Sequence, residues 1–130
     1  MKNTIDLNSF DMVAESNKGE PLALNFKGVP TGITLNVLGD FADKVKAHQQ
    51  ALTFDYARKQ KMAEKRGTEA DLLIQLLENS DEQSIKNACV RVTGWTGLTD
   101  EFNPENLKRL FAKNPQWITE VINFSAEMGK

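Results

Sequence analysis

The amino-acid sequence predicts a mainly α-helical protein with a small N-terminal β-hairpin, an α+β class in which a bundle of about five helices follows the hairpin. Apolar and polar residues alternate at 22–26 and again at 33–38, which is the period of a β-strand. Beyond residue 40 the apolar residues recur every three or four positions, which is the period of a helix. The composition, 40% apolar and 26% charged, is typical of a folded globular domain.

A short helix is expected before the hairpin, over residues 8–18. Phe10, Val13 and Ala14 share one face at helical spacing. Gly19 is expected to end this helix, because glycine readily adopts the left-handed conformation found at helix ends. This segment therefore introduces the first strand.

The hairpin is expected to have a longer loop, because residues 27–32 are rich in turn formers. Two strands alone are only marginally stable in water, so their apolar face must pack on a helix or pair with another edge. Gly39 marks a boundary between an N-terminal lobe, residues 1–39, and a helical body, residues 40–130. One compact domain is nevertheless expected overall.

A long helix is predicted over about residues 41–66. Asp40 is expected to be its N-cap, with Asp43 in the first turn, where the helix dipole favours negative charge. Gly67 is expected to end it. Its apolar stripe consists of Phe41, Val45, Leu52, Tyr56 and Ala63.

Two shorter helices are predicted next, each opened by a capping box. Thr68 is paired with Asp71 in the first box, and Ser80 with Gln83 in the second. The wide apolar face of the first of these helices argues for burial; it consists of Leu72, Leu73, Leu76 and Leu77. The second is followed by a predicted loop over 93–102, which contains two glycines.

The last two helices have clear start signals. Asn103 is an expected N-cap, and Pro104 follows at the first helical position, which proline prefers. The pair at 114–115, Asn-Pro, should end this helix and start the last one. Trp117 is in phase with the apolar stripe of the last helix, which favours a core position for it.

The sequence offers little for catalysis or metal binding, since it contains one histidine, His48, and one cysteine, Cys89. A zinc site needs three or four such ligands, and no Gly-x-Ser-x-Gly turn or phosphate-binding loop is present. Asp40 and Asp43 are better explained as helix-start acids than as cation ligands. We therefore predict no enzymatic activity, no metal and no cofactor, and the lone cysteine fits a reducing compartment.

A basic cluster on the long helix raises the question of nucleic-acid binding; it consists of Arg58, Lys59, Lys61, Lys65 and Arg66. Glu64 and Glu69 interrupt it, and no aromatic platform accompanies it for base stacking. The net charge of −2 gives no overall attraction to nucleic acid or to anionic membrane. We therefore interpret the basic cluster as a solvated helix face rather than a nucleic-acid-binding surface. No stretch of the sequence is apolar enough to span a bilayer.

Aromatic residues in the C-terminal third are the candidates for contacts with a protein partner, because such residues are enriched in interface hot spots. For Trp95, in its glycine-flanked loop, a core position and an interface position remain equally open. The candidate partner-binding residues are Trp95, Leu98, Phe102, Leu110, Phe111 and Trp117.

The same region carries a family resemblance. Residues 91–102, Arg-Val-Thr-Gly-Trp-Thr-Gly-Leu-Thr-Asp-Glu-Phe, are followed by Pro-Glu-Asn-Leu at 104–107 and Leu-Phe at 110–111. Together with the hairpin pattern at 26–33 and 37–40, this resembles the tail assembly chaperones of long-tailed bacteriophages. The loop between Gly97 and Asn103 is shorter than in the usual family pattern.

The resemblance implies a non-enzymatic protein that binds the long, helical tape measure protein in the cytoplasm of the infected bacterium. Such chaperones keep the tape measure protein soluble until tail tube subunits polymerise around it, so the tail tube protein is a second expected partner. Wide apolar helix stripes are suited to an amphipathic client helix, and the hairpin edge to strand addition or homo-oligomerisation. The alternatives are a structural virion component, such as a minor tail or head–tail connector protein, and a nucleic-acid-binding helical protein.

Overall fold

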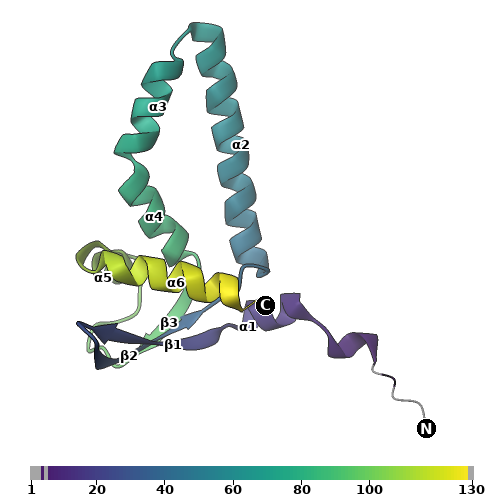
Figure 1. Cartoon of the computed structure of the whole chain (residues 1–130), viewed down its shortest axis with the longest axis vertical. Helices are drawn as coiled ribbons and strands as arrows, with labels where there is room; N and C mark the ends of the chain where they lie inside the picture. The colour runs from purple at the N-terminus through teal and green to yellow at the C-terminus, as the bar shows by residue number, and fades with distance from the viewer. Residues whose placement is uncertain (1–3, 5, 129–130) are drawn as a thin grey trace.

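The computed structural model describes residue 4 and residues 6–128, and its architecture confirms the predicted α+β class, with a hairpin followed by five helices (Figure 1). The elements, in chain order, are a 3₁₀ helix (Leu7–Ser9), α1 (Met12–Lys18), β1 (Glu20–Phe26), β2 (Val29–Val37), α2 (Asp43–Arg66), α3 (Glu69–Glu78), α4 (Ser80–Cys89), β3 (Val92–Thr96), α5 (Pro104–Lys113) and α6 (Pro115–Glu127).

The elements are arranged as a compact base with a projecting arm. The sheet, α5 and α6 form the base, and α1 lies beside it with the 3₁₀ helix extending away (Figure 1). The arm consists of α2 on one side and the consecutive helices α3 and α4 on the other (Figure 1). Gly67, in the left-handed conformation at φ 68°, ends α2 at the tip as expected.

The sheet is antiparallel with strand order β1-β2-β3. The predicted longer loop over 27–32 is wrong, because Phe26 pairs directly with Val29 and only Lys27 and Gly28 make the turn. Both turn residues have positive φ, 53° and 80°, as in the tight turns that match the natural twist of a hairpin. The turn formers at 30–32 lie instead within β2.

The third strand corrects the predicted loop over 93–102. Val92–Thr96 pairs with β2, with Trp95 opposite Leu35 and Val92 opposite Val37. Five residues containing a glycine give a weak local strand signal, so the pairing with β2, more than 50 residues earlier in the chain, determines the conformation. The hairpin thereby gains a third strand from the helical part of the chain.

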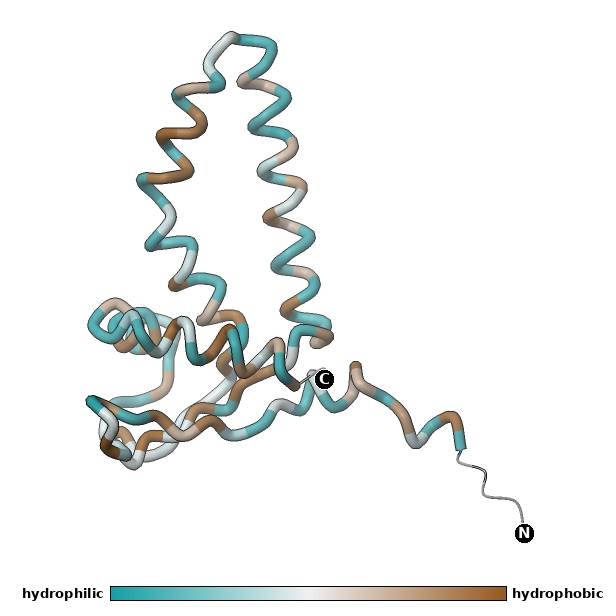
Figure 2. Tube along the Cα trace, viewed as in Figure 1, coloured by the Kyte–Doolittle hydropathy of each residue, from teal (hydrophilic) through white to brown (hydrophobic). Residues whose placement is uncertain are grey.

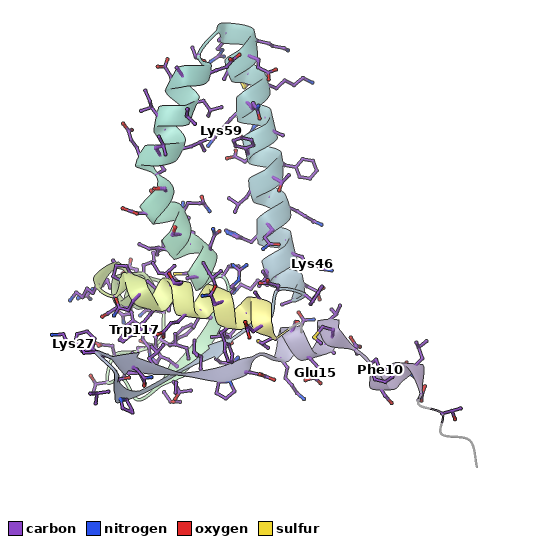
Figure 3. All side chains as sticks on the ribbon, in the orientation of Figure 1. Phe10, Glu15, Lys27, Lys46, Lys59 and Trp117 are labelled. Atoms are coloured by element: carbon purple, nitrogen blue, oxygen red, sulfur yellow. The ribbon has the colours of Figure 1, made fainter. Side chains whose placement is uncertain are left out.

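The main core lies between one face of this sheet and helices α4, α5 and α6. Trp117 is only 3% exposed and lies between α6 and the sheet (Figure 3), which confirms its predicted core position. Its indole N–H donates a hydrogen bond of 2.9 Å to the carbonyl oxygen of Asn25. The buried residues of this core are Leu24, Leu35, Val37, Ala88, Val92, Leu107, Phe111, Trp117 and Val121.

Three of the predicted helix caps are wrong. Asp40 does not cap α2, whose N-cap is Ala42 and has no side-chain cap. Thr68 precedes α3 without a capping hydrogen bond, so its box with Asp71 is not formed. Ser80 lies inside α4 and donates to the carbonyl oxygen of Leu77, because α3 and α4 follow one another with only Asn79 between them.

The predicted starts of the last two helices are confirmed. Asn103 caps α5 by accepting a hydrogen bond of 2.8 Å from the backbone N–H of Asn106, and Pro104 opens the helix as predicted. Pro115 opens α6 as predicted. The expected helix over 8–18 is shorter, since Asp11 caps α1 and a separate 3₁₀ turn precedes it.

Gly97→Ala is expected to lower the free energy of unfolding by about 2 kcal/mol or more, because left-handed backbone costs about 1–2 kcal/mol with a Cβ. Gly97 has φ 90°, and a Cβ there would collide with the carbonyl oxygen of Gly32 in β2. Gly94→Ala is the matched control, since a Cβ at Gly94 meets nothing within 4 Å. Urea unfolding of both variants checks this, and equal midpoints would contradict it.

Candidate protein-interaction surface

The arm differs from the base in how little of it is buried. Val45 and Ala63 are the buried residues of the 24-residue helix α2, and α3 has none. The two sides of the arm meet mainly near the tip, where α2 contacts α3. The arm therefore presents most of its side chains to its surroundings.

Large apolar side chains are exposed along both sides of the arm. Phe54 on α2 is 77% exposed, and Leu73 and Leu77 on α3 are 61% and 69% exposed. The full set on the arm is Phe54, Tyr56, Met62, Leu73, Ile74, Leu76 and Leu77. The apolar stretch of α3 is visible in brown in Figure 2. Clustered exposed apolar side chains of this kind mark interaction surfaces.

The exposure of α3 corrects the prediction that its wide leucine face is buried. Leu72 is half-buried, and Leu76 faces the space between α2 and α3, but Leu73 and Leu77 point to solvent. The reason is geometric: among the described residues α3 packs mainly against α2, and one neighbouring helix can contact only one stripe of it. A helix that is apolar over more than one stripe has an apolar face left over for another molecule.

A groove of about 750 Å³ lies between α2 on one side and α3 and α4 on the other. Its lining is mixed, with the apolar side chains of Leu52, Tyr56 and Leu76 among polar ones. At the end nearer the base, His48 Nε2 lies 2.8 Å from Asn87 Oδ1 on α4. Because this oxygen also accepts a hydrogen bond from Gln83, the arrangement fits a His48 that donates from Nε2. His48 is thus a bridge between the two sides of the arm.

Asp55 on the groove side of α2 is held by cations of its own helix. Lys59 Nζ lies 3.0 Å from it, and Arg58 Nη2 lies 2.8 Å from it. The hydrogen bond from Lys59, with a smaller contribution from Arg58, lowers the pKa of Asp55 from its ordinary value. Lys59 lies on the side of α2 that faces α3 (Figure 3). Part of the basic cluster is therefore paired within α2.

The base of the arm is held by a buried guanidinium. Arg91 lies two residues after the end of α4, and its Nη2 is 3.3 Å from Oδ1 of Asp40, which precedes α2. It also donates to Ser125 Oγ on α6 at 3.2 Å and to the carbonyl oxygen of Asn87 at 2.6 Å. Ser125 in turn donates to Leu38. These contacts fix both ends of the arm against α6, and they explain why Asp40 does not cap α2.

Of the six candidate partner-binding residues, two are buried and four are half-buried. Phe111 and Trp117 are buried in the core. Trp95 and Phe102 pack edge to face against each other, with ring centroids 5.1 Å apart, and both contact the core. Leu98, Leu110 and Trp95 line a small surface pocket of about 130 Å³. The structure therefore brings three of the six to one half-buried place.

The exposed residues of the arm are absent from the candidates chosen by sequence. Phe54 gave a usable signal, because it is a large apolar residue that lies off the predicted apolar stripe of α2. The leucines of α3, which cover more than one stripe of the helix, were a second indication of an interaction surface. The sequence alone does not distinguish an uncovered apolar face from a buried one.

The remaining thiol and carboxylate groups do not form a second candidate site. Burial raises the pKa of the half-buried Cys89 thiol. Asp43 accepts a hydrogen bond of 3.1 Å from the side chain of Asn17, and Asp40 is engaged by Arg91. Over residues 4 and 6–128, no group of three or more His, Cys, Asp and Glu side chains is placed to hold a metal ion.

Comparisons with family models, curated protein sequences and solved structures find no match to this chain. Within the part of the chain that the structure describes, no helix has both the length and the apolar character needed to cross a bilayer.

Proposed function

We propose that this chain is a non-enzymatic chaperone that binds an α-helical client protein through its arm. The observation that carries the proposal is the row of large apolar side chains exposed on α2 and α3, beside an open groove. A groove between helices is a common seat for an amphipathic helix, whose apolar face contacts such side chains. The arm is anchored at its base by Arg91, so it can present this surface at a fixed angle.

The proposed client is the tape measure protein of a long-tailed bacteriophage, and the proposed setting is the cytoplasm of the infected bacterium. Support comes from the resemblance of residues 91–111 to tail assembly chaperones and from the apolar surface that a chaperone for a long helical protein requires. The tail tube protein is a second proposed partner. The contacts are expected on the arm rather than on Phe111 or Trp117, which are enclosed by the core.

A double substitution on α3, Leu73→Ser with Leu77→Ser, is expected to lower the yield of soluble client roughly tenfold, as loss of interface hot spots does. The measurement is co-expression with tape measure fragments, followed by quantification of soluble client and of the complex on size exclusion. Because both side chains are mostly exposed, the helical circular dichroism of the variant should match that of the unaltered protein.

The matched control is Leu7→Ser with Phe10→Ser, which removes two apolar side chains outside the arm that are even more exposed, at 84% and 72%. This control should rescue the client normally. Client that stays insoluble with the unaltered protein, or an arm variant that rescues as well as the control does, would reject the proposal.

Mass spectrometry of purified phage particles separates a chaperone from a virion component. The chaperone proposal expects the chain to be missing from mature particles. Its presence in a fixed ratio to the tail proteins would favour a minor tail or connector protein instead.

A further inference from the structure

The two sides of the arm carry opposite charge. α2 contains seven basic and three acidic residues. α3 contains three acidic residues and no basic one, and α4 adds two acidic residues and one basic. Among the described residues, the ion pairs within the arm join residues of the same helix, and none crosses from α2 to α3 or α4. The charge on α2 is therefore not used to close the arm.

The side of α2 that faces away from α3 combines apolar and basic side chains. Phe54 is nine residues from each of the buried residues Val45 and Ala63, about two and a half turns, so it lies on the opposite face. Lys61 and Lys65 follow Phe54 by seven and eleven positions, which places them on the same face. Neither lysine takes part in an ion pair among the described residues. We call Phe54, Arg58, Lys61 and Lys65 the outer face of α2.

The outer face is not flat. A shallow hollow of about 370 Å³ lies beside Phe54 and is lined by Lys46, Gln49, Gln50 and Thr53. One bulky side chain of a partner helix can enter this hollow while its flanking acidic residues meet Lys61 and Lys65. Glu64 lies at the edge of this face and is the acid that such a partner would have to approach.

The chemistry selects an acidic helix over nucleic acid. A nucleic-acid surface needs several cations in a row and, for single strands, several stacking rings. Here Phe54 is the aromatic residue on the face, Asp55 already holds Arg58, and the acidic helix α3 forms the other side of the same arm. An amphipathic helix with carboxylates beside its apolar stripe matches both the ring and the lysines.

We propose that the outer face of α2 binds a segment of the client that is an amphipathic helix with acidic flanks. This rests on the proposed function, because the segment belongs to the client protein. It adds a second contact to the groove and α3, on the opposite side of α2, and it specifies the charge of the client segment that binds there. The lysines mainly raise the association rate and favour acidic over basic helices, and Phe54 packs against the apolar side of the bound helix.

The test uses two designed helical peptides with the same apolar stripe, one flanked by glutamate and one by lysine. Fluorescence anisotropy with the full chain should give roughly tenfold tighter binding of the glutamate peptide at low ionic strength, with the difference shrinking as added salt screens the charges. Lys61→Glu with Lys65→Glu should reverse the preference. Phe54→Ser should weaken both peptides.

Lys108→Glu with Lys113→Glu is the matched control, because it makes the same charge change on exposed positions of α5. It should leave the preference for the glutamate peptide intact. Equal affinity for the two peptides, or a preference that survives the reversal on α2, would overturn the proposal.

Other outcomes would assign the outer face to a different partner or separate this inference from the proposed function. Displacement of the glutamate peptide by a short DNA duplex at equal concentration would assign the face to nucleic acid and overturn the proposal. So would loss of self-association in Phe54→Ser, measured by sedimentation, without any peptide binding to the unaltered protein, since the face would then belong to a second copy. Client rescue that persists in Lys61→Glu with Lys65→Glu, while the peptide preference is absent, would reject this inference and leave the proposed function standing.

Discussion

Trp117→Ala will lower the free energy of unfolding by about 4 kcal/mol, within the range found when a buried aromatic residue is truncated to alanine. Trp117 is 3% exposed, and its removal leaves a cavity between α6 and the sheet. The carbonyl oxygen of Asn25 also loses the hydrogen bond from the indole. Chemical denaturation followed by circular dichroism measures the change.

Trp117→Phe separates the two contributions, because it keeps most of the ring volume and removes the hydrogen bond. It should recover more than half of the lost stability. Phe54→Ala is the exposed control, since Phe54 contributes little to the core, and its unfolding midpoint should stay close to that of the unaltered protein. A Trp117→Ala variant as stable as Phe54→Ala would contradict the described core.

Arg91→Met is expected to cost about 3 kcal/mol, because removing one partner from a buried, hydrogen-bonded charge network is strongly destabilising. The side chain of Arg91 is 6% exposed, whereas that of Asp40 is 37% exposed. Water therefore screens the carboxylate, and much of the loss should come from the unpaired carbonyl oxygen of Asn87 and from Ser125. Thermal or chemical unfolding gives the magnitude.

The position of Arg91 predicts which elements lose stability in Arg91→Met. Asp40 precedes α2 and Arg91 follows α4, so the substitution loosens both ends of the arm. Hydrogen exchange should speed up most at the base of α2 and α4, and less in β1. Arg58→Met, which removes an exposed pair on α2, should leave exchange there nearly unchanged. Uniform acceleration over the whole chain would contradict a local role at the arm base.

Much of the secondary structure follows from local signals in the sequence. Alternation identified the hairpin, and helical spacing with capping or terminating residues identified α2, α5 and α6, as at Gly67 and at Asn103 with Pro104. These signals act over a few residues, so they are legible in the sequence wherever no distant contact competes with them. The tight turn at Lys27 and Gly28 was missed because Pro30 and Gly32, which follow it, resemble the residues of a longer loop.

The third strand was hidden for a different reason. The segment 92–96 is short, contains glycine and gains its conformation from pairing with β2. Asp40 has the properties of an N-cap, yet the buried guanidinium of Arg91 engages it, and no local pattern announces a partner 51 positions away. Contacts between residues distant in sequence decide such cases, because their energy exceeds local preference.

The sequence by itself determined the class of the protein, the position of most helices and the core role of Trp117, since these depend on periodicity and on local start and stop signals. The tertiary structure decided which apolar faces are covered. Leu77 and Phe111 are both apolar residues on amphipathic helices, yet one is exposed and the other buried. The difference arises because Phe111 joins the main core, with α5 packed against α4 and α6, while Leu77 lies on the arm beyond the base, where it stays 69% exposed.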